Sequence, residues 1–190
     1  MAADPYTPIL TEAGFAAALA AVDGGFQVDI THVAVGAAGY TVAVNGAGRS
    51  AAVALQDERQ RVAIQDAREV GGGQTDISFV LEDDGTSFYI REVGFYLADG
   101  TLFALASHPT QALMWKSDAT RSALALELVL AGVDPAAVTI VATGPALNLL
   151  MTEEFARLLE GQAQLSLVAF QTWEAFYAAH SIYPNQGGPV

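Results

Sequence analysis

The sequence contains no cysteine and only three histidines among its 190 residues. Without cysteine the chain can form no disulfide bond, and it can supply no thiolate to a metal or to a reaction. The histidines are His32, His108 and His180, and none has another histidine or an acidic residue at the spacing of metal ligands. We therefore expect no metal site, no cofactor and no cysteine-based chemistry.

Basic residues are also scarce. Eight lysines and arginines stand against 21 acidic residues, which gives a formal net charge of −13. Proteins that bind nucleic acid or an anionic membrane surface need cations that displace the counterions of the phosphates. The charge therefore argues against nucleic acid and against an anionic membrane as partners, but it does not by itself indicate a function.

Charged residues of either sign make up only 15% of the sequence, whereas hydrophobic residues make up 52%. Soluble domains usually contain about 25% charged residues. This composition predicts apolar surface that a single copy would leave in contact with water. We therefore expect the chain to form oligomers.

The sequence shows neither a signal peptide nor a run that is long enough to cross a membrane. Its first residues lack a basic segment and reach a proline at Pro5, and the longest alanine-rich run, residues 15–22, is too short to span a bilayer. We expect synthesis in the cytoplasm and no insertion into a membrane.

The N-terminal part predicts an arm followed by one helix. Two prolines favour an extended arm over residues 1–10. Thr11 can cap a helix whose alanine-rich body runs to Val22, because a threonine side chain accepts hydrogen bonds from the amides of the first turn. The glycines after Asp23 can end that helix in the left-handed conformation.

Seven later segments have the alternating or β-branched patterns that predict strands. Asp99-Gly100 between two of them indicates a hairpin turn, since both residues accept a positive φ. Helix and strands together predict an α+β fold, in which the N-terminal helix packs on a mostly antiparallel β domain. The predicted strands cover residues 27–35, 61–65, 76–81, 88–97, 101–107, 121–130 and 138–143.

From Thr152 onward, apolar residues recur at the spacing of one helical face. We expect a helix from Thr152 to about His180 and a loose tail over residues 183–190. Because its aromatic residues need a partner surface, we interpret residues 151–182 as an oligomerising helical stem that follows a domain of residues 11–150. A helix folded back on that domain is the alternative. The expected interface residues are Phe155, Leu158, Leu159, Gln162, Leu165, Ala169, Phe170, Trp173, Phe176 and Tyr177.

No pattern in the sequence points to an enzyme. A serine nucleophile elbow of the form G-x-S-x-G does not occur, and the acidic residues lie in predicted turns or beside arginines. The cluster of residues 82–86 offers hard oxygen atoms of the kind that Ca²⁺ prefers. Its spacing is not that of an EF-hand, and we interpret it as a β-turn.

The most specific pattern is the stretch from Phe88 to Ser107, which we call the signature stretch. It contains an aromatic pair, an Arg-Glu-Val-Gly sequence, an Asp-Gly turn and an apolar strand. This stretch resembles the signature of the phage tail-collar fibre family, and two further landmarks of that family occur in order at residues 11–14 and 33–36. The residues that carry the resemblance are Phe88, Tyr89, Arg91, Glu92, Gly94, Asp99 and Gly100.

The resemblance implies a structural component of a phage tail fibre, located in the virion tail, that attaches a trimeric fibre to the baseplate. The implied partners are further copies of the chain, a baseplate protein and a distal fibre or receptor-binding protein for which this chain acts as adaptor. The arm, residues 1–10, is our candidate for contact with the baseplate. A carbohydrate-binding module of the tail is the alternative. It would use Tyr6, Tyr40 or Trp115, each of which is isolated in the sequence.

Arg91 and Glu92 are adjacent in a predicted strand, so their side chains point to opposite faces. Strict alternation would place Glu92 on the same face as Phe88 and Ile90. Since the two charged residues cannot pair with each other, we interpret each as half of an ion pair that stabilises the sheet. A binding role for Arg91 is the alternative. The candidate partners are Asp83, Asp84, Glu58 and Arg59.

Overall fold

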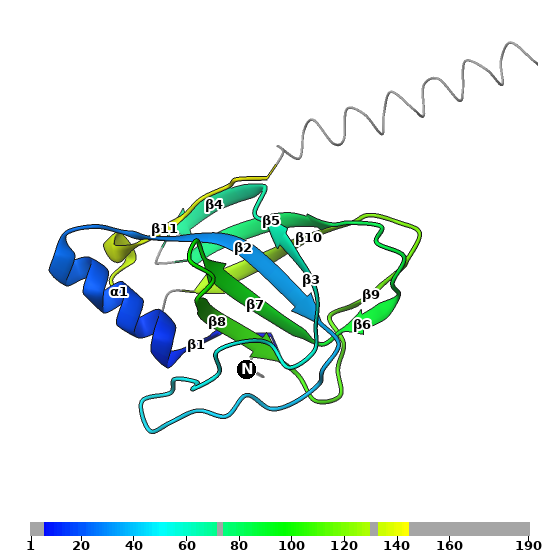
Figure 1. Cartoon of the computed structure of the whole chain (residues 1–190), viewed down its shortest axis with the longest axis horizontal. Helices are drawn as coiled ribbons and strands as arrows, with labels where there is room; N and C mark the ends of the chain where they lie inside the picture. Colours follow the sequence, from blue (N-terminus) through cyan, green and yellow to red (C-terminus); the bar gives the residue numbers. More distant parts are fainter. Residues whose placement is uncertain (1–5, 72–73, 130–132, 145–190) are drawn as a thin grey trace, which may run out of the picture. The chain divides into compact units, whose positions relative to one another are not determined.

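Strands dominate the regular structure of the chain, which the computed structural model describes over residues 6–71, 74–129 and 133–144 (Figure 1). These residues contain one α-helix, one 3-10 helix and eleven strands. The helices are α1 (Glu12–Gly24) and η1 (Pro135–Ala137). The strands are β1 (Ile9–Leu10), β2 (Val28–Gly36), β3 (Glu58–Ala63), β4 (Asp66–Gly71), β5 (Gln74–Leu81), β6 (Phe88–Ile90), β7 (Glu92–Leu97), β8 (Leu102–Ser107), β9 (Met114–Lys116), β10 (Ser122–Val129) and β11 (Val138–Ile140).

Helix α1 begins and ends as the sequence predicts. The Thr11 side chain accepts a hydrogen bond from the amide of Gly14 at 2.8 Å, which satisfies one N–H group of the first turn. Gly25 ends the helix with a φ of 68°, a conformation that glycine adopts without strain. The helix lies so close to β8 that a Cβ atom on Gly14 would collide with the carbonyl oxygen of Phe103.

The larger sheet has six strands. Five follow the order β1-β8-β7-β2-β11, and β3 pairs with the second half of β2. All pairs are antiparallel except that of β11 with β2. Strands β7 and β8 form the predicted hairpin, and β1 places the end of the N-terminal arm at the edge of this sheet.

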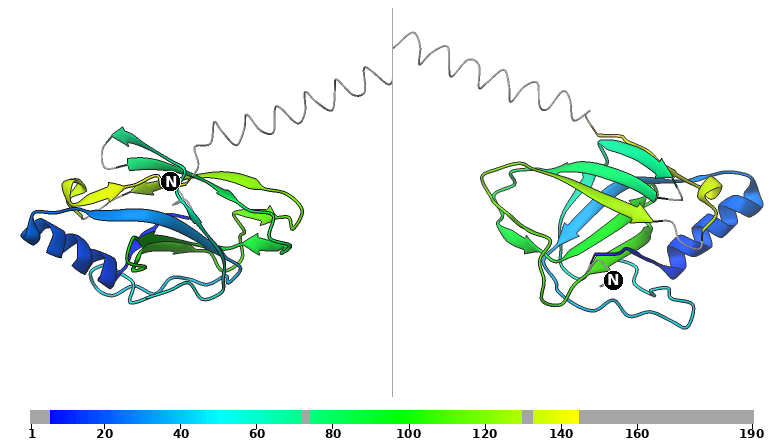
Figure 2. Two further views of the ribbon diagram at one scale, coloured as in Figure 1. Left: turned by 45° about the horizontal axis from the view of Figure 1, so that its top comes forward. Right: turned by 180° about the vertical axis from the view of Figure 1, so that it is seen from behind.

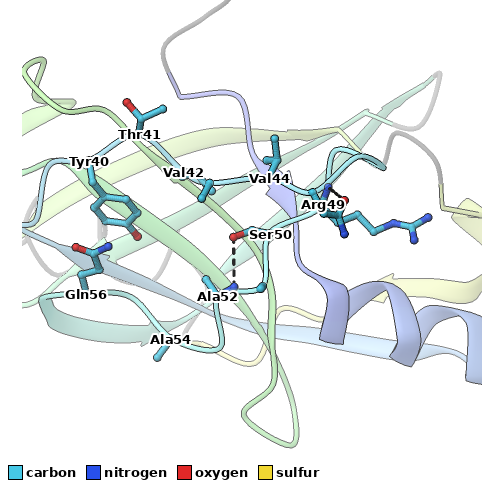
Figure 3. Close-up of a pocket in the computed structure, with 12 residues that line it drawn as sticks. Tyr40, Thr41, Val42, Val44, Arg49, Ser50, Ala52, Ala54 and Gln56 are labelled. Carbon is cyan, nitrogen blue, oxygen red and sulfur yellow. Dashed lines mark hydrogen bonds between the residues drawn. The ribbon is translucent and has the colours of Figure 1, made fainter.

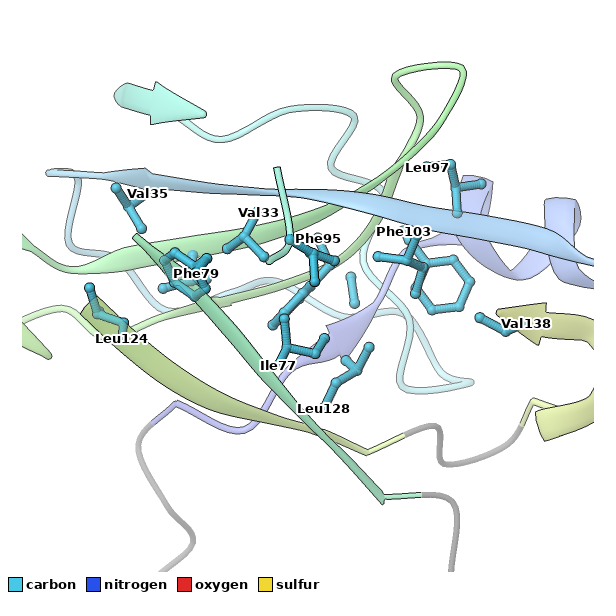
Figure 4. Packing of buried hydrophobic residues seen from close by; sticks show 14 of the residues in the cluster. Val33, Val35, Ile77, Phe79, Phe95, Leu97, Phe103, Leu124, Leu128 and Val138 are labelled. Carbon is cyan, nitrogen blue, oxygen red and sulfur yellow. The ribbon is translucent and has the colours of Figure 1, made fainter. Parts of the chain in front are cut away.

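A second sheet, in the order β10-β5-β4, forms another layer over the first (Figure 2). The side chains of the two layers meet in the main core. Val33 and Phe95 come from the larger sheet, and Ile77, Phe79 and Leu128 come from the smaller one (Figure 4). All five side chains are buried, and such burial of large apolar groups is the main source of stability in a sandwich of this kind.

The opposite face of the larger sheet is covered by the segment between β2 and β3, residues 37–57. Val42 and Leu55 of this segment are buried in a second apolar cluster with Tyr96 and Leu102 of the β7–β8 hairpin. The larger sheet is therefore covered on one face by a sheet and on the other by a long loop.

The predicted α+β class is wrong, because the described residues form a mostly β fold. The layer that covers the larger sheet is a second sheet, while α1 packs beside β8 and η1. The N-terminal segment has a clear helical pattern, and we therefore expected its helix to cover one face of the sheet. The predicted helical stem, residues 151–182, lies outside the described residues and adds nothing to the observed class.

The predicted strand of residues 88–97 is two strands in two different sheets. Strand β6 pairs with β9 in a two-stranded sheet, and β7 joins the larger sheet. The alternation of faces changes at Arg91 between them. Ile90 and Val93 therefore both contribute to the main core, whereas Glu92 lies under the loop on the other face. The expectation of strict alternation through this stretch is wrong.

Candidate docking surface and its framework

Glu92 is a buried hydrogen-bond acceptor. Its carboxylate accepts hydrogen bonds from the backbone amides of Asp57 at 2.7 Å and Gln56 at 3.0 Å, and from the hydroxyl of Tyr40 at 3.1 Å. Burial and the nearby carboxylate raise the pKa of the Tyr40 hydroxyl, so Tyr40 remains a donor. Glu92 thus fixes both ends of the segment 37–57 to the sheet.

Tyr96 on β7 holds the same loop from a second point. Its hydroxyl accepts a hydrogen bond from the amide of Leu55 at 3.3 Å and donates one to Glu58 at 3.1 Å. Arg61 pairs with Glu58 at 2.8 Å, and its guanidinium carbon lies 3.6 Å from the centroid of the Tyr96 ring. The loop and β3 are therefore attached to β7 by side chains.

The ion-pair interpretation of Arg91 and Glu92 is wrong. No ion pair joins either residue to any of the described residues. Among the candidate partners, Glu58 and Arg59 pair with residues in or next to β3, and Asp84 pairs with a lysine. A buried carboxylate surrounded by backbone amides needs no cation, because the N–H groups satisfy its lone pairs.

Gly94, Asp99 and Gly100 of the signature stretch shape the β7–β8 hairpin. A Cβ atom on Gly94 would lie 3.0 Å from a methyl carbon of Leu102, so the packing favours glycine there. The Asp99 carboxylate accepts a hydrogen bond from the amide of Thr101 at 2.9 Å, which lowers the pKa of that carboxyl group. Gly100 has a φ of 88°, as the predicted turn requires.

The two-stranded sheet of β6 and β9 is anchored by a buried lysine. Lys116 is fully buried, and its ammonium group donates hydrogen bonds to Asp84 at 2.7 Å and to the carbonyl oxygens of Thr86 at 3.2 Å and Ser117 at 3.3 Å. The lysine lowers the pKa of the Asp84 carboxyl to about 2, with Thr86 contributing. The described residues contain no group of three or more histidines and acids that could hold a metal ion.

Two aromatic side chains of this small sheet face the solvent. Tyr89 and Trp115 are register partners, with ring centroids 4.6 Å apart and an angle of 61° between the rings. They are 53% and 49% exposed, although their neighbours Phe88 and Ile90 are buried. The guanidinium carbon of Arg91 lies 5.8 Å from the centroid of the Tyr89 ring. We call Tyr89, Arg91 and Trp115 the aromatic–arginine patch.

The described part of the arm lies close to the patch. The hydroxyl of Tyr6 donates a hydrogen bond to the carbonyl oxygen of Gln111 at 2.7 Å, and the Tyr6 ring lies 6.5 Å from the ring of His108. The amide of His108 in turn donates to the carbonyl oxygen of Arg91 at 3.1 Å. Partial burial raises the pKa of Tyr6.

A separate cavity of about 430 Å³ lies within the segment 37–57 (Figure 3). Alanine and valine form much of its wall, and Tyr40 lies beside Gln56. Of the residues that line it, only Arg49 is charged, and its guanidinium extends away to lie 3.2 Å from the centroid of the Phe15 ring. This lining offers no pair of groups for acid–base chemistry.

The predicted site residues have different outcomes. The expected oligomer interface, residues 155–177, lies outside the described residues. Of the three candidate sugar-binding aromatics, Tyr6 and Tyr40 are partly buried and hydrogen-bonded, whereas Trp115 is paired with Tyr89 and is not isolated. The pair was not predicted because strand β9 was not predicted, and its three residues give no local signal beyond the β propensity of Trp115.

Within the residues that the structure describes, no helix has the length and apolar character needed to cross a membrane. The described residues thus form a mostly β fold with an exposed aromatic pair above buried residues. Residues 1–156 match the family described as phage tail-collar fibre protein, N-terminal. The match covers more than half of the chain, so the chain belongs to this family, and the resemblance of the signature stretch is confirmed.

Family membership makes the chain a structural component of a phage tail fibre, located in the virion tail. Searches of curated proteins and of solved structures gave no match to the chain.

Proposed function

We propose that this chain is the module by which a trimeric tail fibre attaches to the baseplate, and that it is the adaptor for a distal fibre or receptor-binding protein. The observation that carries this proposal is the aromatic–arginine patch. Tryptophan, tyrosine and arginine are the residue types most enriched among the hot spots of protein interfaces. Here all three lie together, within or opposite the signature stretch, and the two aromatic rings of the patch are about half exposed.

The framework beneath the patch supports a docking role. Phe88 and Ile90 alternate with the patch residues and are buried in the main core, and Lys116 follows Trp115 into the interior. A surface held in this way loses little conformational freedom when a partner binds, and the binding free energy is correspondingly larger.

A second exposed surface supports the association of copies. Leu19 and Val22 are 51% and 50% exposed, and with Phe15 they follow a spacing of four and three residues along α1, while Phe26, 55% exposed, follows the left-handed Gly25 just beyond the helix. This spacing aligns side chains on one side of a helix. We propose that copies of the chain contact each other through this α1 face, three being the number that the family resemblance implies.

Two further contacts belong to the proposal. The segment 151–182, with its apolar residues between Phe155 and Tyr177, adds to the self-association. The arm, residues 1–10, contacts the baseplate beside the patch, since Tyr6 already lies near Arg91 in the described domain.

Binding of the purified chain to fibreless tails tests the attachment. Tails from a phage mutant that does not make the chain are incubated with the wild type, with the Y89A/W115A variant, and with V53A as a control at a 77% exposed valine. We expect the double variant to bind at least about 100-fold more weakly, because each truncated hot spot removes about 2 kcal/mol of binding free energy and about 1.4 kcal/mol corresponds to tenfold. Wild-type affinity of the double variant, or no binding by the wild type, would contradict the proposal.

The Tyr89–Trp115 pair also supports a second function, carbohydrate binding by the tail. Exposed aromatic rings can pack against sugar rings, but an angle of 61° between the two rings does not form a flat platform. We therefore rank protein docking first. Glycan binding by the wild type that is lost in W115A would favour the carbohydrate function, and equal binding by both proteins would remove it.

A further inference from the structure

Arg91 is a cation that has no acidic partner among the described residues. Its side chain is partly exposed, yet its Nε atom is buried and has no hydrogen-bond acceptor. The carboxylates nearest in sequence are engaged elsewhere, Glu92 with the loop amides and Asp84 with Lys116. Arg49 and Arg68 also have no ion pair among the described residues, so Arg91 is distinguished by its buried, unpartnered Nε atom and by its place beside Tyr89.

The backbone and stem of Arg91 are held in place. Its amide donates to the carbonyl oxygen of Gly36 at 3.0 Å, and its carbonyl oxygen accepts from the amide of His108 at 3.1 Å. The loop packs on the aliphatic stem, since a Cβ atom on Gly39 would lie 3.1 Å from the Arg91 Cδ atom. The guanidinium is therefore presented in a defined place, while its own hydrogen-bonding capacity is not used.

The surroundings of Arg91 favour one kind of ligand. A guanidinium binds a carboxylate through two parallel N–H···O bonds, and a carboxylate is the group of matching geometry that the side chains of a protein partner supply. Tyr89 and Trp115 add apolar surface beside the cation. A partner that satisfies both features carries an acidic side chain next to an apolar one.

We propose that Arg91 binds a carboxylate of an aspartate or glutamate on the tail protein to which the fibre attaches, and that an apolar side chain next to this carboxylate packs on Tyr89 and Trp115. This inference rests on the proposed attachment function and specifies the chemistry of the partner. The ligand is an acidic protein segment, so the contact is complementary to one of the few cations of an acidic module.

Charge-removing variants test the contact in binding to fibreless tails. R91Q removes the guanidinium from the patch, and R68Q removes the same charge from Arg68, an exposed residue of β4. We expect R91Q to bind at least about tenfold more weakly than the wild type, because truncating one partner of a close charge pair raises the dissociation rate. R68Q should stay within about twofold, since a distant charge affects only long-range steering.

Cross-linking identifies the partner group directly. The chain contains a single lysine, Lys116, and it is fully buried. R91K therefore adds a lone exposed lysine at the patch, and R68K adds one at the control site. A carbodiimide joins an amine to a carboxylate that touches it, so R91K bound to tails should yield a peptide cross-linked from position 91 to an aspartate or glutamate of a tail protein, and R68K should not.

The outcomes separate this inference from the function on which it rests. Failure of the wild type to bind tails would overturn both. Weak binding by Y89A/W115A together with wild-type binding by R91Q, or R91K that binds without a cross-link at position 91, would overturn only the carboxylate contact. Loss of binding in R91Q with the expected cross-link supports it.

Discussion

Arg91 and Glu92 are neighbours in the sequence and carry opposite charges, yet their environments have little in common. Glu92 is buried and accepts hydrogen bonds from two loop amides and from Tyr40, so its carboxylate oxygens are satisfied by N–H and O–H groups. Arg91 is partly exposed beside two aromatic rings. Within the signature stretch, single residues therefore divide into those that hold the loop and hairpin and those that face the solvent.

The role of Glu92 can be measured by urea unfolding. E92A leaves two amides and a hydroxyl without their acceptor, and we expect it to lower the free energy of unfolding by about 3 kcal/mol. Y40F removes one of the three bonds and should lower it by about 1 kcal/mol. E69A, at an exposed acid of β4, is the control and should change it by less than about 0.5 kcal/mol. An E92A protein as stable as E69A would contradict the assigned role.

The Asp84–Lys116 pair predicts a pH dependence. The folded-state pKa of Asp84 is lowered from 3.8 to about 2, so its contribution to stability is present above the ordinary pKa and is lost as pH falls toward 2. We expect D84N to be about 2 kcal/mol less stable than the wild type at pH 7, and the difference to shrink between pH 4 and 2. Unfolding in urea at several pH values measures it.

A double variant provides the control for this pair. D84N leaves the Lys116 ammonium buried without its anion, whereas D84N/K116M removes both charges. The double variant should recover part of the lost stability, because a buried unpaired charge is more costly than a buried apolar side chain. A double variant less stable than D84N would show that the lysine contributes by its bonds to the backbone.

At the scale of secondary-structure elements, the close contact between Gly14 and the backbone of β8 determines the position of α1. Gly14 lies against β8 because no side chain fits between the helix and the carbonyl oxygen of Phe103. Alanine is the better helix former by about 1 kcal/mol, so propensity and packing oppose each other at this position.

Substitution of this glycine shows which effect is larger. We expect G14A to lower the free energy of unfolding by about 2 kcal/mol, since overpacking at a backbone contact outweighs the gain in propensity. A20G, on the exposed side of α1, should lower it by about 1 kcal/mol. Thermal unfolding of the two variants measures this, and a G14A protein more stable than the wild type would refute the packing argument.

The elements also show how far the sequence could be interpreted. The caps of α1, the Asp99-Gly100 hairpin and strand β5 depend on local chemistry and were predicted within a few residues. Strand β9 has only three residues, which is too short for a period to be recognised. The break at Arg91 and the pairing of Tyr89 with Trp115 depend on contacts between distant segments, and no local pattern contains them.

At the scale of the whole molecule, the described domain has two exposed apolar surfaces. The α1 face and the β6–β9 sheet lie at opposite ends of it (Figure 1). A module with two separated surfaces can bind its own copies and a different partner at the same time. This arrangement suits a fibre subunit that is joined to its neighbours and to the tail.

Association of copies through α1 is tested by L19Q/V22T. Replacing two half-exposed apolar side chains by polar ones should raise the dissociation constant of the oligomer by about tenfold or more, because burying the exposed half of each contributes about 0.75 kcal/mol or more. V53Q, at an exposed valine of the loop, should leave it unchanged. Sedimentation over a concentration series measures the constants, and equal values for both variants would exclude the α1 face.

The central claim is that the aromatic–arginine patch is covered when the fibre is attached. Hydroxyl-radical footprinting of the unmodified chain, alone and assembled on tails, measures this directly, since Tyr89 and Trp115 are both about half exposed in the described domain. We predict that oxidation of both residues falls at least about fivefold on assembly, as expected for hot-spot residues from which water is excluded. Equal oxidation of Tyr89 and Trp115 in the two states would contradict the account.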